Sequence, residues 1–327
     1  MVEQSIGKSV LRKEDLRFIT GTGSYTDDIN LRGQSYAYFV RSPYAHATIG
    51  NIDTMDARNM PGVIEILTGK QVAEDGLGSL PCGWTVHSKD GSEMKQPHHP
   101  VMADSKVNYA GEPVAMVIAE SIVAAKNAAE QVVVDYAELD AVVSVASAQS
   151  SAQIHDEAPG NTCYEWELGD KALTDAAIKG AAHVTRYEFT NNRLIPNAME
   201  PRAAIADYNK GTDDLTLYTT SQNPHLARLI LTAFVQIAPE HKLRVIAPDV
   251  GGGFGSKIFV YSEETALAWA AKKLGIAIKW TAERSESFLA DAHGRLWPYA
   301  GHVHQGQYAI WKLLFQLLKV LQVPSGS

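Results

Sequence analysis

The sequence predicts an α+β fold in two parts, and three observations lead to this prediction. Short apolar runs with strand character alternate with short helical segments over residues 13–145. A linker rich in Ser, Ala and Gln at residues 144–153 separates them from a second series of strands and helices. The third observation is a glycine-rich turn at residues 251–255, between an apolar run and a helical segment. With 327 residues, 45% of them hydrophobic, the chain can hold two domains with sizeable cores.

The first part is expected to start with a short helical turn. Glycines and prolines recur between Gly69 and Ala103, which predicts loops there. His98 and His99 lie in that stretch, and because neighbouring side chains point different ways, a solvated loop or interface is favoured over a metal site. The expected elements are the helical turn at 13–19, strands at 35–40, 63–68, 113–119 and 132–136, and a helix at 121–131.

The second part is expected to hold a helix at residues 173–179 that ends at Gly180, an alternating strand at 183–190 and a strand at 215–218. Asn223 is placed to cap a further helix, because proline is well tolerated in a first helical turn and Pro224 follows. The core stripe predicted for that helix consists of Leu226, Leu229, Ile230 and Ala233.

The glycine-rich turn is the most informative feature of the chain. It follows an apolar, β-branched run at residues 243–247 and precedes a helix at 263–273 that has acids in its first turn, lysines in its last and a glycine beyond. Ser262 is a candidate cap of that helix. Such a turn can adopt φ > 0, approach a ligand closely and point N–H groups at anionic oxygens. Phe254, an apolar ring inside the turn, indicates the wall of a pocket.

Two common phosphate-binding loops are excluded by counting. The P-loop pattern fails on both sides of Lys257, at Ser256 and at Ile258. The dinucleotide pattern needs a third glycine, but that position holds Ser256 when it is counted from Gly251. A plain glycine turn without a ligand is the alternative, and the presence of Phe254 makes it less favoured.

The segment GGGFGSK at residues 251–257 resembles the molybdopterin-contact segment of the molybdenum hydroxylases, the family of xanthine dehydrogenase, aldehyde oxidase and aerobic carbon monoxide dehydrogenase. Blocks at residues 17–28, 41–47, 109–115, 199–202 and 220–225 also resemble that family, in matching order, from about Ile6 to Arg295. The resemblance implies an α/β hammerhead domain over residues 1–145. It implies the N-terminal part of a molybdopterin-binding domain over residues 150–295.

The resemblance also implies a cofactor, molybdopterin with molybdenum, expected in its cytosine dinucleotide form. Gln222 stands where the family has a glutamine whose amide donates to an oxo ligand of the metal, a task that suits its two N–H donors. The backbone of Gly252, Gly253, Phe254 and Gly255 is expected to lie against the metal and the pterin. Because the pterin dithiolene holds the metal, no side chain is assigned as a metal ligand.

No catalytic residue is assigned, because the family's general base is a glutamate far towards the C-terminus and no acid here matches its motif. Arg295 resembles an arginine near the substrate pocket of some family members, and a solvated surface arginine is an equal alternative. Glu200 is expected to be structural, since a glutamate before Pro-Arg can pair locally. The substrate stays open among aldehydes, N-heterocycles and carbon monoxide.

The composition limits the kinds of partner that the chain can have. A net charge of −8 argues against nucleic acid, and no export signal or run of 18 apolar residues is visible, so we expect a cytoplasmic chain without a membrane span. Cys82 and Cys163 are too few for an iron–sulfur cluster or a Cys-based zinc site, and idle thiols are favoured over a disulfide. The electrons must therefore leave through partners. The resemblance implies an FAD subunit and a [2Fe-2S] subunit in a heteromeric complex.

The tail at residues 296–327 departs from the family, whose members continue to more than twice this length. A surface-binding amphipathic helix, a core helix and an aberrant end are the three interpretations, and the abrupt break favours the last. We therefore expect a truncated chain that is inactive alone. A non-catalytic fragment that docks on partner subunits is the alternative. The tail has one helical stripe of apolar residues: Ile310, Leu313, Leu314, Leu317, Leu318 and Leu321.

Overall fold

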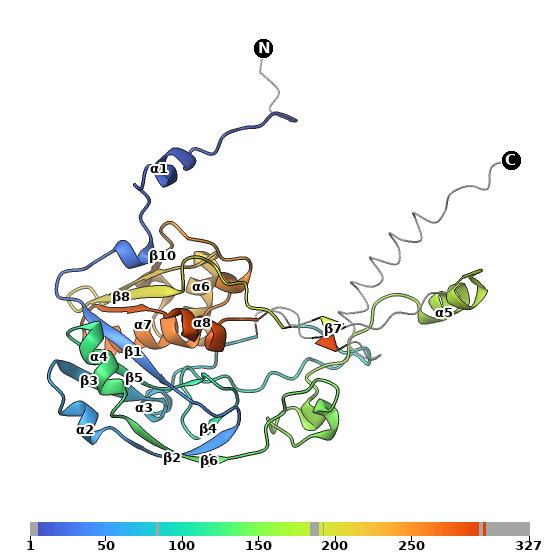
Figure 1. Ribbon diagram of the computed structural model, residues 1–327, viewed down its shortest axis with the longest axis horizontal. Helices are drawn as coiled ribbons and strands as arrows, with labels where there is room; N and C mark the ends of the chain where they lie inside the picture. Colours follow the sequence, from blue (N-terminus) through green and yellow to red (C-terminus); the bar gives the residue numbers. More distant parts are fainter. Residues whose placement is uncertain (1–5, 83–84, 184–189, 192, 294–296, 299–327) are drawn as a thin grey trace.

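The computed structural model describes residues 6–82, 85–183, 190–191, 193–293 and 297–298. Its centre is a seven-stranded mixed sheet in the order β10-β9-β8-β11-β1-β5-β3 (Figure 1). The pairs β1–β11 and β10–β9 are parallel and the other neighbours are antiparallel. In sheet order the strands are Leu243–Ile246, Asp214–Thr219, Ala203–Asn209, Ile278–Thr281, Ser35–Arg41, Pro113–Ala119 and Val63–Thr68.

This sheet joins the two predicted parts of the chain. Strand β1 pairs with β11 in parallel, with Ser35 opposite Ile278 and Tyr36 opposite Lys279. Strands β3 and β5 extend the sheet on the β1 side, and β8, β9 and β10 extend it on the β11 side. Residues on both sides of the 144–153 linker therefore share one set of main-chain hydrogen bonds.

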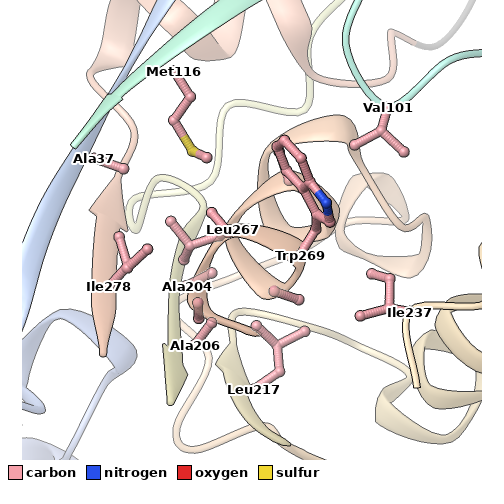
Figure 2. Close-up of a cluster of buried hydrophobic side chains, with 14 of the residues drawn as sticks. Ala37, Val101, Met116, Ala204, Ala206, Leu217, Ile237, Leu267, Trp269 and Ile278 are labelled. Carbon is pink, nitrogen blue, oxygen red and sulfur yellow. The ribbon is translucent and has the colours of Figure 1, made fainter. Parts of the chain in front are cut away.

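Helices cover both faces of the sheet. Side chains of a strand alternate between the two faces, so a strand of apolar residues needs cover on each side. Every residue of β5 is buried, as expected for a strand covered on both sides. Met116 and Ile118 of β5 belong to the larger core cluster with α7 (Ser262–Leu274), whereas Ala115 and Val117 pack with α4 (Ile122–Ala129). Figure 2 shows the larger cluster, with Leu267 and Trp269 of α7 among side chains that include Met116, Leu217, Ile237 and Ile278.

A second, three-stranded antiparallel sheet has the order β4-β2-β6 and its own small apolar cluster of Ala47, Ala103, Val107 and Val114. Its strands are Lys106–Val107, Ala47–Asp53 and Val133–Glu138. A third pair joins β7 (Thr190–Asn191) to β12 (Trp297–Pro298). The remaining helices are α1 (Asp15–Ile19), α2 (Met55–Arg58), α3 (Gly69–Glu74), α5 (Lys171–Gly180), α6 (Pro224–Leu229) and α8 (Arg284–Ala290). Helix α5 stands apart from the main body and buries none of its residues (Figure 1).

Several predicted elements are confirmed. Strands β3 and β5 have the predicted bounds, and α4 begins after Ser121, whose hydroxyl oxygen accepts the Ala124 N–H. Asn223 caps α6 with Pro224 in the first turn. The prediction for Ser262 is wrong by one residue, since Tyr261 is the N-cap of α7.

Other predictions need correction. The stripe predicted for α6 is partly wrong, because Leu229 and Ala233 are exposed while Leu231 and Val235 are buried. From Ile230 on, the cause is a π-helical turn at Ile230–Phe234, which changes the spacing of the side chains from that of an α-helix. The 69–103 stretch begins with α3 rather than a loop. Of the strand predicted at 183–190, residues 184–189 lie outside the described residues, as does most of the 296–327 tail.

Among the residues that the structure describes, no helix combines the length and the apolar character needed to traverse a bilayer.

Candidate functional site

The glycine turn has the backbone that its composition predicts. It connects β10 to a short 3-10 turn at Ser256–Ile258, which leads into α7. Gly252 and Gly255 have φ of +96° and +93°, where a side chain would be strained. Phe254 also has a positive φ, +51°, which costs on the order of 1 kcal/mol or more for a non-glycine residue. Strain of this kind persists only where the surroundings hold the chain in place.

Two side chains press against this turn. A Cβ added at Gly253 would lie 2.3 Å from Oε1 of Gln222, and one added at Gly251 would lie 2.5 Å from Cβ of Glu200. Both glycines are therefore required for close approach rather than for a special φ. The structure brings together Gln222 and the turn, two features that are about thirty residues apart in the sequence and were predicted to share a site.

Gln222 follows β9 and precedes α6, so a strand end and a capped helix fix its main chain. Its backbone N–H donates to the Lys257 carbonyl at 2.8 Å. Its side-chain Oε1 accepts the Gly255 N–H at 3.0 Å. Because an N–H can only donate, the amide oxygen must face Gly255 and the amide nitrogen must face away. That NH₂ group donates to no other residue that the structure describes, and the side chain is exposed.

Three successive backbone N–H groups of the turn also have no acceptor among the described residues. Within the described part of the chain, the amides of Gly252, Gly253 and Phe254 have no hydrogen-bond acceptor, although Gly253 is buried. Buried N–H groups without a partner are rare in proteins. Successive N–H groups in a turn with left-handed residues form a concave site for anions. The turn and the Gln222 amide thus offer donors and no negative charge to a ligand.

The Phe254 ring lies against the turn instead of the protein core. A Cβ at Gly252 would be 2.9 Å from its Cε2, and the residue is 75% exposed. The ring therefore covers one side of the backbone at Gly252 and offers its other face to solvent or to a ligand.

A buried ion network lies beside the turn. Arg202, directly before β8, donates to Glu263 at 2.8 Å and to Asp291 at 2.5 Å. Arg41 of β1 reaches the other oxygen of Glu263 at 2.7 Å and also contacts Glu286. Burial alone would raise the pKa of Glu263, but the guanidinium groups of Arg202 and Arg41 outweigh it and lower this pKa to about 2. The carboxylate thus stays charged.

The next residue in α7 behaves in the opposite way. Burial raises the pKa of Glu264 to about 7, and its bond from the Thr219 hydroxyl, 3.2 Å long, only partly offsets that effect. Glu112 has no cationic partner at contact distance in the described residues, and burial raises its pKa to about 7 as well. These carboxyls titrate near neutral pH.

The remaining sequence-based predictions have mixed outcomes. Arg295 lies outside the described residues. Glu200 is structural as expected, but its partner is Lys257, 57 positions away, and not a local residue. Lys257 is the residue whose role the sequence did not reveal, and its place directly after the glycine turn was the available signal. In the described ranges no group of three or more His, Cys, Asp and Glu residues could hold a metal ion.

Both parts of the chain match known protein families. Residues 20–140 match the sequence model of the aldehyde oxidase and xanthine dehydrogenase a/b hammerhead domain, and residues 154–304 match that of the molybdopterin cofactor-binding domain. The chain is 35% identical over 309 residues to the carbon monoxide dehydrogenase large chain of Afipia carboxidovorans. It is 37% identical over 291 residues to the nicotine 6-hydroxylase large subunit of Paenarthrobacter nicotinovorans.

Those alignments cover 89% and 88% of this chain but only 37% and 34% of the relatives. The crystal structure of quinoline 2-oxidoreductase from Pseudomonas putida 86 superposes with a TM-score of 0.78 at 35% identity. That superposition covers 90% of this chain and 36% of the other. The chain therefore spans about a third of the length of the relatives that it matches.

Proposed function

Because the chain belongs to the molybdenum hydroxylase family, in which it corresponds to the hammerhead domain and the start of the molybdopterin-binding domain, we propose that its glycine turn forms one wall of a molybdopterin site. The observation that carries this proposal is the meeting of Gln222 with a turn that has three unpartnered N–H groups. Both offer hydrogen-bond donors at a place where a Cβ would clash. An anionic, oxygen-rich cofactor matches that donor set.

The residues fit the cofactor in the following way. The NH₂ group of Gln222 would donate to an oxygen of the cofactor, since its own oxygen is already held by Gly255. The amides of Gly252, Gly253 and Phe254 would donate to its other oxygens, and the Phe254 ring would shield them from water. When bound, the molybdenum cofactor supplies the two-electron chemistry by which a substrate carbon gains an oxygen derived from water. The chain's own groups orient the cofactor and donate hydrogen bonds to it.

The wider assignment extends this proposal. The cofactor is proposed to be the cytosine dinucleotide form. The electrons are proposed to leave through partner subunits with FAD and [2Fe-2S] centres, in a cytoplasmic complex. The comparison proteins are a large chain and a large subunit, which supports a multi-subunit assembly. Their names refer to carbon monoxide and to nicotine. For this chain an aldehyde, an N-heterocycle and carbon monoxide remain the candidate substrates.

The chain alone is proposed to be inactive. It spans about a third of its relatives, and we assign no general base to it. Met199, next to Glu200, is 90% exposed, and Phe288 of α8 is 51% exposed. Those apolar groups favour a second candidate function, a non-catalytic fragment that docks on partner subunits.

The test compares Gln222→Met with the control Gln131→Met, which replaces an exposed glutamine after α4. The protein is purified with whatever subunits accompany it from its native host. Molybdenum content and dye reduction with aldehydes, N-heterocycles and carbon monoxide are then measured. We expect the Gln222 variant to lose molybdenum by about tenfold or more, since removing a hydrogen bond to a charged group costs about 1.5–3 kcal/mol. Equal metal content in both variants would count against the proposal. Co-purification of partner subunits without molybdenum would favour the docking fragment.

A further inference from the structure

Lys257 carries a buried positive charge that the proposed donor set does not use. Its side chain is 2% exposed, and its ammonium donates to the Glu200 carboxylate at 2.9 Å and to the Glu200 carbonyl at 2.8 Å. Burial lowers the pKa of Lys257, against the effect of Glu200. A well-packed apolar pair is often no less stable than such a buried ion pair. The pair at this position therefore calls for a role other than stability.

Glu200 holds the start of the glycine turn from both sides. Its Oε2, the oxygen that faces Lys257, also accepts the Gly251 N–H at 2.7 Å. The Glu200 backbone N–H donates to the Gly251 carbonyl at 3.2 Å. With the close approach of its Cβ to Gly251, this leaves the first glycine of the turn no freedom to shift.

Lys257 holds the end of the turn through its main chain. Its carbonyl accepts the Gln222 N–H at 2.8 Å, and the Gln222 side chain in turn accepts the Gly255 N–H. One residue thus connects Glu200, through its ammonium, to Gln222, through its carbonyl. The three unpartnered amides of residues 252–254 lie between these two attachment points.

We propose that Lys257 and Glu200 are a positioning pair. They hold the amides of residues 252–254 and the Gln222 amide in the shape that binds the cofactor, and they do not contact the cofactor themselves. This inference rests on the proposed function for its ligand. The lysine has a second task, because Oε1 of Glu200 is buried without a partner in the described chain. Without Lys257 the carboxylate would repel an anionic cofactor from the turn.

The charges make a specific prediction about variants. Lys257→Met leaves a buried carboxylate beside the anion-binding amides, so it should lower cofactor binding more than a double variant that also removes this carboxylate. The double variant Lys257→Met/Glu200→Gln removes that charge, and its glutamine oxygen can still accept the Gly251 N–H. It should therefore recover part of the loss. Lys273→Met is the matched control, because Lys273 pairs with Asp75 at 2.6 Å far from the turn on the partly exposed end of α7.

The first measurement is hydrogen exchange, which does not depend on a cofactor. In Lys257→Met we expect the amides of Gly251 and Gly255 to exchange about tenfold faster or more, with β5 and β8 unchanged, because only a local opening is made easier. The control should match the wild type. Unchanged exchange at the turn, or an equal increase in β5 and β8, would show a merely structural lysine and overturn the proposal.

The second measurement is the molybdenum content of the protein purified with its native partners. The Lys257→Met variant should contain about tenfold less molybdenum than the wild type, and the double variant should recover a substantial part, as expected for coupled residues. If the wild type itself contains none, the proposed function fails while the exchange experiment still tests the pair. If Lys257→Met loads as well as the wild type, the positioning role is wrong.

Discussion

At the scale of single residues, the close approach of Gly253 to Gln222 gives the sharpest prediction. In Gly253→Ala the new Cβ would lie 2.3 Å from Oε1 of Gln222, so the amide must move and its bond from Gly255 must break. We expect molybdenum content to fall by about tenfold or more, while unfolding changes little because the Gln222 side chain that must move is exposed. Metal analysis and thermal unfolding check both expectations.

The control for this change is Gly180→Ala. Gly180 ends α5, has no atom within 4 Å of an added Cβ and has no positive φ. That variant should leave both metal content and unfolding as in the wild type. If Gly253→Ala behaved in the same way, the contact between the turn and Gln222 would be unimportant for the cofactor.

Glu264 gives a prediction about pH. Burial raises its pKa from the ordinary 4.5 to about 7, so between these values the folded state binds more protons than the unfolded state. Its contribution to stability is therefore fully present below about pH 4.5 and is lost as the pH rises through about 7. Glu264→Gln should be more stable than the wild type at pH 8 by on the order of 3 kcal/mol, and by less than about 1 kcal/mol at pH 5.

Urea unfolding at both pH values measures this difference. Glu112 titrates in the same window, so the wild-type pH dependence contains both carboxyls. Only the difference between the variant and the wild type isolates Glu264. Parallel pH profiles for the two proteins would contradict the prediction.

At the scale of elements, the buried ion network joins β1, β8, α7 and α8 through Arg41, Arg202, Glu263, Glu286 and Asp291. These residues lie in segments that are far apart in the sequence. Their contacts could not be predicted, because charged residues in a strand or a first helical turn are usually solvated. Burial came from the packing of α7 over β8, which only the folded chain shows.

Removing one member of this network should be costly. Arg202→Met removes the cation that Glu263 and Asp291 share and leaves excess negative charge in the interior. It also removes a guanidinium that lies 3.9 Å from the Tyr261 ring centroid. We expect a loss of about 3–5 kcal/mol in the free energy of unfolding. Arg228→Met breaks only an exposed pair with Glu240 and should cost less than about 1 kcal/mol. Equal losses in chemical denaturation would show that burial of the network does not matter.

The elements also show what the sequence could and could not predict. Strand β5 was predicted with its bounds because its apolar run is uninterrupted, and β3 because its β-branched and apolar residues start directly after a Pro-Gly turn. Strand β8 was missed because it is rich in alanine, which has little strand preference. Strand β11 was missed because Lys279 interrupts its apolar pattern. That ammonium is buried and donates hydrogen bonds to the Asp27 and Ile29 carbonyls. Each of these bonds joins residues more than 200 positions apart in the sequence.

The same limit applied to the site. Gln222 and the glycine turn could be found because each stands in a recognisable block, and the structure brings them within hydrogen-bond distance. The Glu200–Lys257 pair could not be found, since nothing in either segment indicates that a loop before β8 lies under a turn after β10. Long-range pairing of charges is decided by the sheet order, and the sequence did not predict that order.

At the scale of the whole molecule, one sheet unites both predicted parts, and the N-terminal segment adds to this union. Arg17 pairs with Asp249 directly before the glycine turn, and the Ser24 N–H donates to the same carboxylate at 2.8 Å. The predicted domains at 1–145 and 150–295 therefore share a hydrogen-bonded sheet and a common site region. We expect that neither part would fold stably without the other.

The surface around the glycine turn gives the last prediction. Apolar side chains are exposed in the glycine turn, beside it at Met199 and in α8, and Arg284 of α8 donates to the Met199 carbonyl at 2.8 Å. Full burial of such a side chain stabilises by about 1.5–3 kcal/mol, so this surface favours association. We define the turn surface as Met199 (90% exposed), Phe254 (75%), Phe288 (51%), Phe259 (49%) and Leu289 (45%).

The isolated chain should therefore associate with increasing concentration, and sedimentation velocity can locate the cause. If the turn surface is responsible, Met199→Ser/Phe288→Ser should shift association to about thirtyfold higher concentration, because two apolar contacts of about 1 kcal/mol each are lost. Val123→Ser/Val133→Ser, at two equally exposed positions in α4 and β6, should change little. If instead deletion of residues 308–327 abolishes association and the serine pair does not, the apolar stripe of the tail is responsible. In that case the turn surface would not be an association site in the isolated chain.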